Sequence, residues 1–145
     1  RGFVHRDYQS RNLMVQEHAD ADPSLVWIDF QDALLGPRVY DLVALLNDSY
    51  QSFDRSFVEA RLDEYSEHHG LDAVGREAVG REFDTVTVQR KLKDAGRFVF
   101  IDRVRGNPAF LGFVEPTIEK VFGALERLDG DPTLDRLHAL LRRLL

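Results

Sequence analysis

The chain has 145 residues, of which 43% are hydrophobic and 30% charged, and it carries a formal net charge of −6. This is enough for one domain with an ordinary core, and the acidic balance argues against nucleic acid as the main partner, because phosphate contacts need a basic face. Cysteine is absent, which excludes disulfides and thiolate metal sites and fits a reducing cytoplasm, and no apolar run is long enough to predict a membrane span.

The first part of the chain is predicted to form a small β unit around a polar loop. Residues 3–5 and 13–16 have the pattern of short strands flanking that loop, and residues 25–30 are a β-branched and aromatic run that suits a partner strand. Residues 16–24 form a polar connection between the strands. Its acidic residues, Asp20 and Asp22, lack a regular ligand pattern, so we interpret them as part of a solvated turn rather than a metal site.

The remainder is predicted to be helical. Pro37 suits the first turn of a helix that runs to residue 47. A second helix is expected over residues 54–69, closed by Gly70, with an inward face formed by Phe57, Val58, Leu62 and Tyr65.

Asp72 is a suitable N-cap for a long helical region that reaches about residue 105. Its β-branched residues Thr85, Val86, Thr87 and Val88 have low helix propensity, so a kink or break is expected between residues 83 and 88.

Residues 106–108 are predicted to form a turn before a helix over residues 115–128. Asp131 and Pro132 then start a last packing helix, whose apolar stripe is Leu134, Leu137, Leu141 and Leu144. The elements together predict a mainly α fold with a small β hairpin.

Three polar residues of the β unit suggest chemistry. Asp7 and Asn12 are five positions apart in the polar loop, so in a compact loop their side chains can converge, and Asp29 ends the second β run. Two carboxylates and a carboxamide form a hard-oxygen set, which suits Mg²⁺ better than zinc. Asp and Asn are also common turn formers, so the alternative is that these three residues only stabilise turns.

The motifs around these residues resemble those of a known fold. His5-Arg6-Asp7 followed by Asn12 is similar to the H-R-D-x-x-x-x-N catalytic loop of the protein-kinase-like fold, and Ile28-Asp29-Phe30 to its magnesium-holding Asp-Phe segment. Three short segments follow these motifs: Gln31-Asp32-Ala33, Gly36-Pro37 and Tyr40-Asp41-Leu42. Together with them, the chain resembles the aminoglycoside phosphotransferase superfamily, from residue 1 to about Phe113.

Within that superfamily the chain most resembles bacterial cell-wall sugar kinases, which phosphorylate N-acetylmuramate and N-acetylglucosamine on the anomeric hydroxyl. The cluster of Gln89, Arg90, Lys91 and Lys93, with Gly96 and Phe98, adds to this likeness. Gln31 stands where many kinases have Gly after Asp-Phe, which fits the sugar-kinase branch and makes an aminoglycoside acceptor less expected.

The resemblance implies a role for each motif residue. Asp7 would accept the proton of the acceptor hydroxyl, and Asn12 and Asp29 would hold Mg²⁺ on the phosphates of ATP. His5 would support the catalytic loop from behind as a buried, hydrogen-bonded histidine. Asp41 would support the same loop, although the helix dipole stabilises a carboxylate near a helix N-terminus equally well without that role.

Contacts to the acceptor are expected from residues beside the motifs and from the basic cluster. The candidates are Tyr8, Arg11, Gln31, Asp32 and Arg90. Arg11 could instead approach the phosphates, and a basic cluster such as that around Arg90 is by itself most often a solvated face. The chain reaches Gly36-Pro37 within a few residues of Phe30, which leaves no activation loop and favours a small acceptor over a protein substrate.

In the kinase-like fold an ATP-clamping lobe precedes the catalytic loop, and neither its Gly-rich loop nor its phosphate-pairing Lys is found in this sequence. We therefore expect residues 1–145 to be the C-terminal lobe of a larger, cytoplasmic, ATP- and Mg²⁺-dependent kinase, inactive without its N-terminal lobe. Two alternatives stay open: an aminoglycoside-modifying kinase, and a non-catalytic nucleotide- or sugar-binding lobe.

Overall fold

The computed structural model describes residues 1–19 and 21–145 of the chain. Its strands are β1 (Gly2–Val4), β2 (Leu13–His18), β3 (Ala21–Trp27) and β4 (Leu34–Gly36). Its helices are α1 (Tyr40–Leu46), α2 (Arg55–His68), α3 (Ala73–Arg105), α4 (Val114–Arg127) and α5 (Pro132–Leu144), with short 3₁₀ turns at Ser10–Asn12 and Pro108–Phe113. The described residues thus form a mainly α fold with a small β component, which confirms the predicted fold class.

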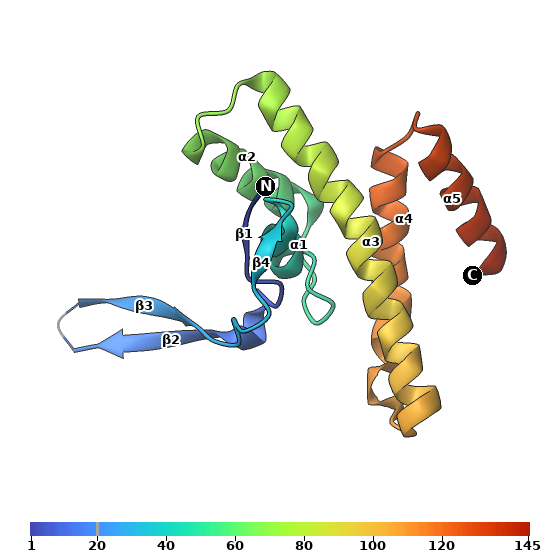
Figure 1. Cartoon of the computed structure of the whole chain (residues 1–145), viewed down its shortest axis with the longest axis horizontal. Coiled ribbons are helices and arrows are strands. Elements are labelled where there is room, and N and C mark those ends of the chain that lie inside the picture. The colour runs from blue at the N-terminus through green and yellow to red at the C-terminus, as the bar shows by residue number, and fades with distance from the viewer. Residues whose placement is uncertain (20) are drawn as a thin grey trace.

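The strands form two separate antiparallel pairs (Figure 1). β1 pairs with β4, and β2 pairs with β3 from Leu13 opposite Trp27 to His18 opposite Ala21. The hairpin of β2 and β3 extends away from the helices, and all its described residues except Leu13 are exposed. Its apolar side chains, among them Trp27 at 55% exposure, are therefore not buried by the described part of this chain.

The long helix α3 connects two hydrophobic clusters. Its first half packs with α1 and α2 around the buried Val43, Leu62 and Phe83. Its second half packs against α4, and α5 lies on α4 (Figure 1); there Val88 meets Val121 and Leu125. The catalytic-loop motif and the Asp29 segment lie beside the middle of this helix.

A buried carboxylate joins three of the helices. Asp84 of α3 is 5% exposed and pairs with Arg127 of α4 at 2.8 Å and Arg55 of α2 at 3.3 Å. A buried charge is tolerated only when it is paired and hydrogen-bonded, so these contacts fix how α2 and α4 are placed along α3.

Most helix predictions are confirmed, and the departures have physical reasons. α3 is a single helix of 33 residues, so the predicted kink is wrong. Val86, Thr87 and Val88 are buried on α3, and Thr85 donates its hydroxyl hydrogen bond to the carbonyl of Arg81 within the helix. Burial of the β-branched residues therefore outweighs their low propensity, which is a weak preference in any tertiary context.

The predicted helix caps are confirmed. Asp72 accepts a hydrogen bond from the Gly75 amide, and Asp131 caps α5 in the same way. Gly70 follows α2 with a φ of 63°, a left-handed conformation that glycine adopts without steric penalty.

Two helix details differ from the prediction. Phe57 is 42% exposed and stacks on Phe53, so it does not join the core as predicted. The first helix begins at Tyr40 rather than at Pro37, which lies in the preceding turn.

The leucine stripe of α5 packs as predicted at Leu134, Leu137 and Leu141, whereas Leu144 is 66% exposed. The strands differ more from the prediction. β2 and β3 extend into the predicted polar connection, and residues 28–30 lie beyond the end of β3. Asp20 of the predicted acidic turn lies outside the described residues.

Candidate active site

The loop that follows β1 has a strained backbone held by distant side chains. Arg6 has a φ of 75°, a left-handed conformation that costs a non-glycine residue about 1–2 kcal/mol. The carboxylate of Asp41 on α1 accepts hydrogen bonds from the amides of His5 at 2.7 Å and Arg6 at 3.0 Å. Arg90 of α3 donates to the carbonyl of Arg6 at 3.0 Å. Two helices thereby hold the backbone that presents Asp7.

The three residues predicted to do the chemistry lie together. The Asn12 side-chain amide donates to the carbonyl of Asp7 at 2.9 Å and to the carboxylate of Asp29 at 3.4 Å. The amide of Ile28 also donates to the Asn12 carbonyl at 3.2 Å. Asn12 therefore links the first motif to the second across 17 positions of sequence.

Asp29 also has a left-handed backbone, with a φ of 69°. Its carboxylate accepts a hydrogen bond from Gln31 at 2.5 Å as well as the one from Asn12. Both contacts are solvent-exposed, and both come from residues of the same β unit. A strained backbone at an exposed carboxylate is a common feature of ligand-binding positions.

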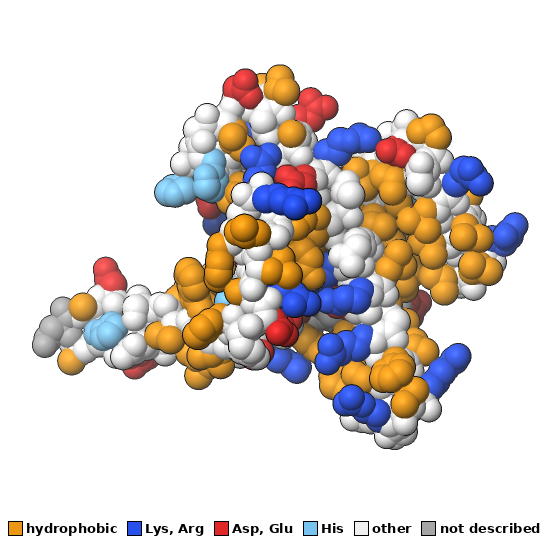
Figure 2. Space-filling model, in the orientation of Figure 1, with side chains coloured by type: hydrophobic (Ala, Val, Ile, Leu, Met, Phe, Trp, Pro, Cys, Tyr) orange, Lys and Arg blue, Asp and Glu red, His pale blue; other side chains and the backbone are white. Residues whose placement is uncertain are grey.

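Asp7 and Asp29 line one cavity of about 310 Å³. Its other walls come from the loop after α1 and from one face of α3; they include Asp48, Ser49, Tyr50, Arg90, Lys91, Lys93, Asp94 and Arg97. The volume lies at the lower end of the range usual for small-molecule sites. Figure 2 shows Lys and Arg side chains gathered between the base of the hairpin and α3, with acidic side chains among them.

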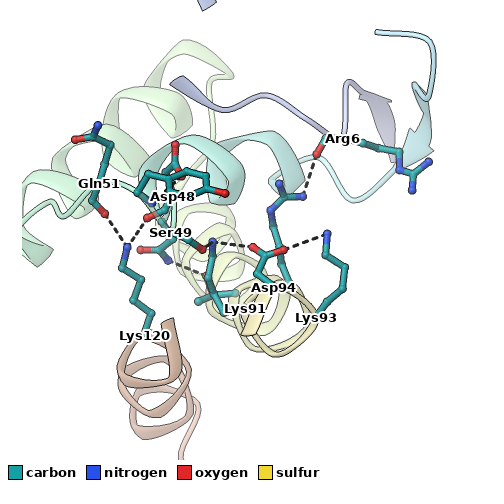
Figure 3. A network of polar contacts seen from close by, with 12 residues as sticks. Arg6, Asp48, Ser49, Gln51, Lys91, Lys93, Asp94 and Lys120 are labelled. Atoms are coloured by element: carbon teal, nitrogen blue, oxygen red, sulfur yellow. Dashed lines mark hydrogen bonds and ion pairs between the residues drawn. The ribbon is translucent and has the colours of Figure 1, made fainter. Parts of the chain in front are cut away.

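Two lysines hold the wall formed by the loop after α1 (Figure 3). Lys91 of α3 is 1% exposed and bonds to Ser49 at 3.1 Å and Asp94 at 3.0 Å. Lys120 of α4 donates to the carbonyls of Asp48 at 2.5 Å and Gln51 at 2.8 Å. This loop is thus fixed from two different helices.

The same loop supports the catalytic loop. The carboxylate of Asp48 is buried and accepts hydrogen bonds from the amide of Ser10 at 3.4 Å and from its hydroxyl at 3.0 Å. The amide of Tyr50 also donates to it, at 3.0 Å. Asp48 therefore holds the far end of the catalytic loop, as Asp41 holds its beginning.

Burial lowers the pKa of both lysines. For Lys91 the effect of burial is opposed by the neighbouring carboxylate of Asp94. For Lys120, burial and the positive charge of Lys91 bring the pKa to about 8, against the opposing effect of Asp48. Both ammonium groups are therefore more acidic than a lysine in water.

The predicted acceptor contacts are scattered around the site. Arg90 lines the cavity, but it is 5% exposed and its guanidinium also lies 4.9 Å from the centre of the Tyr40 ring. Arg11 lies over the ring of Tyr50 at 3.8 Å, and Tyr8 packs edge-on against Trp27.

Gln31 contacts Asp29, and Asp32 accepts a hydrogen bond from Arg6 only through its backbone carbonyl. The cavity-lining residues of the described chain include Arg90 but not Tyr8, Arg11, Gln31 or Asp32. Their roles toward an acceptor stay predictions.

His5 lies behind the catalytic loop, as expected, and is 3% exposed. Its ring packs edge-on against Tyr8 at 5.9 Å between centroids. Within the described chain its two ring nitrogens have no hydrogen-bond partner. The histidine is buried as predicted, and it is hydrogen-bonded through its backbone amide only.

Sequence reasoning missed several residues of the cavity, chiefly Asp48, Asp94 and Arg97, and also Lys120, which holds the loop after α1 from behind. One signal was available: Arg90, Asp94, Arg97 and Ile101 follow a spacing of four, three and four, which places them on one face of a helix. No local pattern marks Asp48 or Lys120, because their contacts join segments about 70 residues apart.

The residues present fit Mg²⁺. Asp29 offers carboxylate oxygens beside Asn12, whose side-chain carbonyl accepts no hydrogen bond from the described residues. Mg²⁺ is commonly bound by one or two carboxylates together with the phosphates of a substrate. Residues 1–19 and 21–145 hold no cluster of three or more His, Cys, Asp or Glu arranged for a metal. In the same residues, no helix is both long and apolar enough to cross a membrane.

Comparison with known proteins gives a consistent family. The model of the "Phosphotransferase enzyme family" matches residues 1–79. An N-acetylmuramate/N-acetylglucosamine kinase of Pseudomonas putida is 38% identical over 116 residues, which cover 77% of this chain and 33% of that protein. The kinase of the same name from Pseudomonas aeruginosa is 38% identical over 118 residues, 79% of this chain and 33% of that protein.

A third relative extends further along the chain. The N-acetylmuramate/N-acetylglucosamine kinase of Neisseria meningitidis is 33% identical over 150 aligned residues, which cover 92% of this chain and 43% of that protein. The chain therefore spans between a third and about two-fifths of the length of these relatives.

Proposed function

The chain belongs to the phosphotransferase enzyme family, which has the kinase-like fold, and we propose that it is the catalytic lobe of a small-molecule kinase. In this proposal it transfers the terminal phosphoryl group of ATP to an amino sugar. The observation that carries the proposal is the single cavity of about 310 Å³ lined by both Asp7 and Asp29, with Asn12 hydrogen-bonded to each of them.

Asp7 is the proposed catalytic residue. Its backbone is fixed from α1 and α3 through Asp41 and Arg90, so its carboxylate can receive a hydrogen bond from an acceptor hydroxyl and take the proton as the new bond to phosphorus forms. Phosphoryl transfer depends mostly on positioning and on neutralising charge, and a fixed loop supplies the first of these.

Asn12 and Asp29 are the proposed magnesium ligands. When bound, Mg²⁺ supplies positive charge against the phosphate oxygens. The chain's own contribution is to hold the two ligands next to Asp7, and the hydrogen bonds of Asn12 to Asp7 and Asp29 support this. Gln31 orients the Asp29 carboxylate from the other side.

The proposed acceptor is N-acetylmuramate or N-acetylglucosamine, phosphorylated on the anomeric hydroxyl. The support is that relatives at 33–38% identity carry these sugars in their names. The cavity wall also suits such a ligand, because Tyr50, Phe98 and Phe110 offer aromatic surface beside polar groups, a combination usual in small-molecule sites.

An aminoglycoside is the second candidate acceptor, favoured by the family alone. An aminoglycoside carries several positive charges, and the α3 wall of the cavity contributes Arg90, Lys91, Lys93 and Arg97. Among the described lining residues, Asp94 is the one carboxylate that α3 adds to this wall, so the wall keeps a net positive charge, which supports a neutral or acidic sugar over a polycation.

We further propose that the kinase works in the cytoplasm, where ATP is available, and that an ATP-binding lobe completes this chain. The greater length of the relatives supports the presence of an ATP-binding lobe, and so does the exposed apolar surface of the hairpin.

The test compares the 145-residue chain with the full-length protein that contains an ATP-binding lobe. ADP release is measured with Mg²⁺-ATP and each of three acceptors: N-acetylmuramate, N-acetylglucosamine and kanamycin. We expect turnover with the amino sugars by the full-length protein and none by the 145-residue chain. Turnover with kanamycin alone would replace the proposed acceptor, and turnover by the 145-residue chain would refute the need for a second lobe.

A further inference from the structure

The cavity wall formed by α3 is a regular stripe of side chains. Arg90, Asp94, Arg97 and Ile101 recur at a spacing of four, three and four and all line the cavity, as residues on one face of a helix do. Arg90 is anchored to the catalytic loop through the carbonyl of Arg6. Arg97 lies two turns further along, about 10 Å by the rise of an α-helix.

Most charged side chains that line the cavity already form ion pairs or hydrogen bonds with other groups of the protein. Arg90 is buried against Arg6 and Tyr40. Asp94 accepts from Lys91 at 3.0 Å and pairs with Lys93 at 3.3 Å. Asp48, the remaining carboxylate of the lining apart from Asp7 and Asp29, is occupied by Ser10 and Tyr50.

Arg97 is the exception. It is exposed and lines the cavity, and within the described chain it forms neither a salt bridge nor a side-chain hydrogen bond. The same end of the cavity is apolar, because Phe98 stacks with Phe110 and Ile101 lies one turn beyond Arg97. An uncommitted guanidinium beside an apolar surface is a suitable site for a planar anion, which arginine can bind through two parallel hydrogen bonds.

We propose that Arg97 is a specificity-determining residue that binds the carboxylate of an acidic amino sugar. N-acetylmuramate is N-acetylglucosamine with a lactyl ether on O3, so the two acceptors differ only at O3, and the carboxylate of the lactyl group is the only charge that distinguishes them. Arg90 bonds to the residue before Asp7, so with the anomeric hydroxyl at Asp7 and the lactyl group at Arg97, the two helical turns from Arg90 to Arg97 leave room for the sugar ring. The inference rests on the proposed function and deepens it.

The matched pair of acceptors makes the proposal testable. The full-length protein and its Arg97→Gln variant are compared by kcat/KM for N-acetylmuramate and for N-acetylglucosamine. A hydrogen-bonded ion pair is worth about 1.5–3 kcal/mol, so Arg97→Gln should lower kcat/KM for N-acetylmuramate about ten- to hundredfold and leave that for N-acetylglucosamine within about twofold. Arg97→Lys should keep part of the preference, because it retains the charge but loses the planar fork.

Arg103→Gln serves as the matched control. Arg103 is exposed on the same helix, six positions beyond Arg97, and is not among the described residues that line the cavity. The substitution Arg103→Gln removes the same charge from α3 without changing a residue that lines the cavity, so the ratio of the kcat/KM values for the two sugars should not change.

Two results would overturn the proposal. An equal loss with both sugars, accompanied by a raised KM for ATP, would assign Arg97 to the phosphates of the nucleotide. Any other result that leaves the ratio of the two kcat/KM values unchanged would show that Arg97 does not bind the carboxylate of the acceptor.

Calorimetric binding of the two sugars to the same proteins separates this inference from the proposed function. If the wild-type protein binds N-acetylmuramate more tightly than N-acetylglucosamine and Arg97→Gln abolishes the difference, the carboxylate site stands even where no phosphoryl transfer is seen. If transfer occurs but neither transfer nor binding depends on Arg97, the proposed function stands and the carboxylate site is refuted.

Discussion

The two carboxylates of the site are held in different ways. The loop that presents Asp7 is bound to the helices by Asp41, Asp48 and Arg90, which lie 35 to 84 positions away from the groups they contact. The segment that presents Asp29 has its side-chain contacts from Asn12 and Gln31; both contacts are exposed, and both residues belong to the β unit.

This difference separates a preformed part of the site from a part completed by its ligands. The long-range hydrogen bonds of the Asp7 loop are mostly part-buried and tie it to the packed helices, so they are lost mainly when the fold itself opens, whereas exposed local ones compete with water. We therefore expect the Asp7 loop to keep its conformation in the 145-residue chain. The Asp29 carboxylate should become ordered when Mg²⁺ and nucleotide bind.

The largest effect is expected from Asp29→Asn, which removes the charged ligand from the segment that depends on it. A metal contributes several kcal/mol of charge stabilisation to the reaction, so kcat/KM should fall by at least about a hundredfold. The Mg²⁺ concentration for half-maximal activity should rise. Both are read from Mg²⁺ titrations of the full-length protein.

Asp22→Asn, an exposed carboxylate on β3, is the control for that experiment. It should change neither quantity. A normal magnesium dependence in Asp29→Asn would remove Asp29 from the metal site.

Asp41→Ala should have the next largest effect, because it leaves the amides of His5 and Arg6 without their acceptor. Hydrogen bonds to a charged group contribute about 1.5–3 kcal/mol, so we expect a loss of that order in the free energy of unfolding. Activity should fall as well, because the left-handed backbone of Arg6 is released. Urea unfolding and kinetics on the same variant measure the two losses.

Asp63→Ala, on the exposed face of α2, controls for the loss of a carboxylate. A variant Asp41→Ala that unfolds like this control would show that the carboxylate is not needed to hold the loop.

Arg90→Lys should have a smaller effect, of about 1 kcal/mol in stability, because a single part-buried hydrogen bond to Arg6 is weakened while the charge is kept. If Arg90 acts by positioning the loop, kcat falls and KM for the sugar does not change. A raised KM with unchanged kcat would instead assign it to acceptor binding, the role predicted from the sequence.

The smallest effect concerns pH. The pKa of Lys120 is about 8 in the folded chain, against an ordinary 10.5, so between these values the unfolded chain binds more protons than the folded one. Stability therefore gains from Lys120 as the pH rises through this window. The difference in unfolding free energy between wild type and Lys120→Met should shift in favour of wild type from pH 8 to pH 10, and parallel curves would contradict it.

The sequence predicts the helices and the three residues proposed for catalysis and magnesium binding, because both the helices and these residues have local sequence patterns. Asp72 and Asp131 cap helices as local patterns require, and Asp7, Asn12 and Asp29 lie in motifs with fixed spacing. β4 was missed because its partner β1 is about thirty positions away and three residues carry no periodicity of their own.

The walls of the cavity were the least predictable part. The contacts of Lys120 with Asp48 and of Arg90 with Arg6 join α4 and α3 to loops far earlier in the chain. Such contacts depend on how the helices pack and have no local sequence pattern. The spacing of Arg90, Asp94 and Arg97 was visible, but only the cavity shows which side of α3 faces the site.

Asp7 is the residue proposed to direct transfer of a phosphoryl group to a sugar hydroxyl. The most direct measurement is ³¹P NMR of the product formed by the full-length protein from Mg²⁺-ATP and N-acetylmuramate, with Asp7→Asn alongside. We predict an anomeric sugar phosphate that forms about 10²- to 10⁴-fold more slowly with the variant, while nucleotide binding is retained. A sugar phosphate that forms equally fast with Asp7→Asn would show that Asp7 is not the catalytic residue.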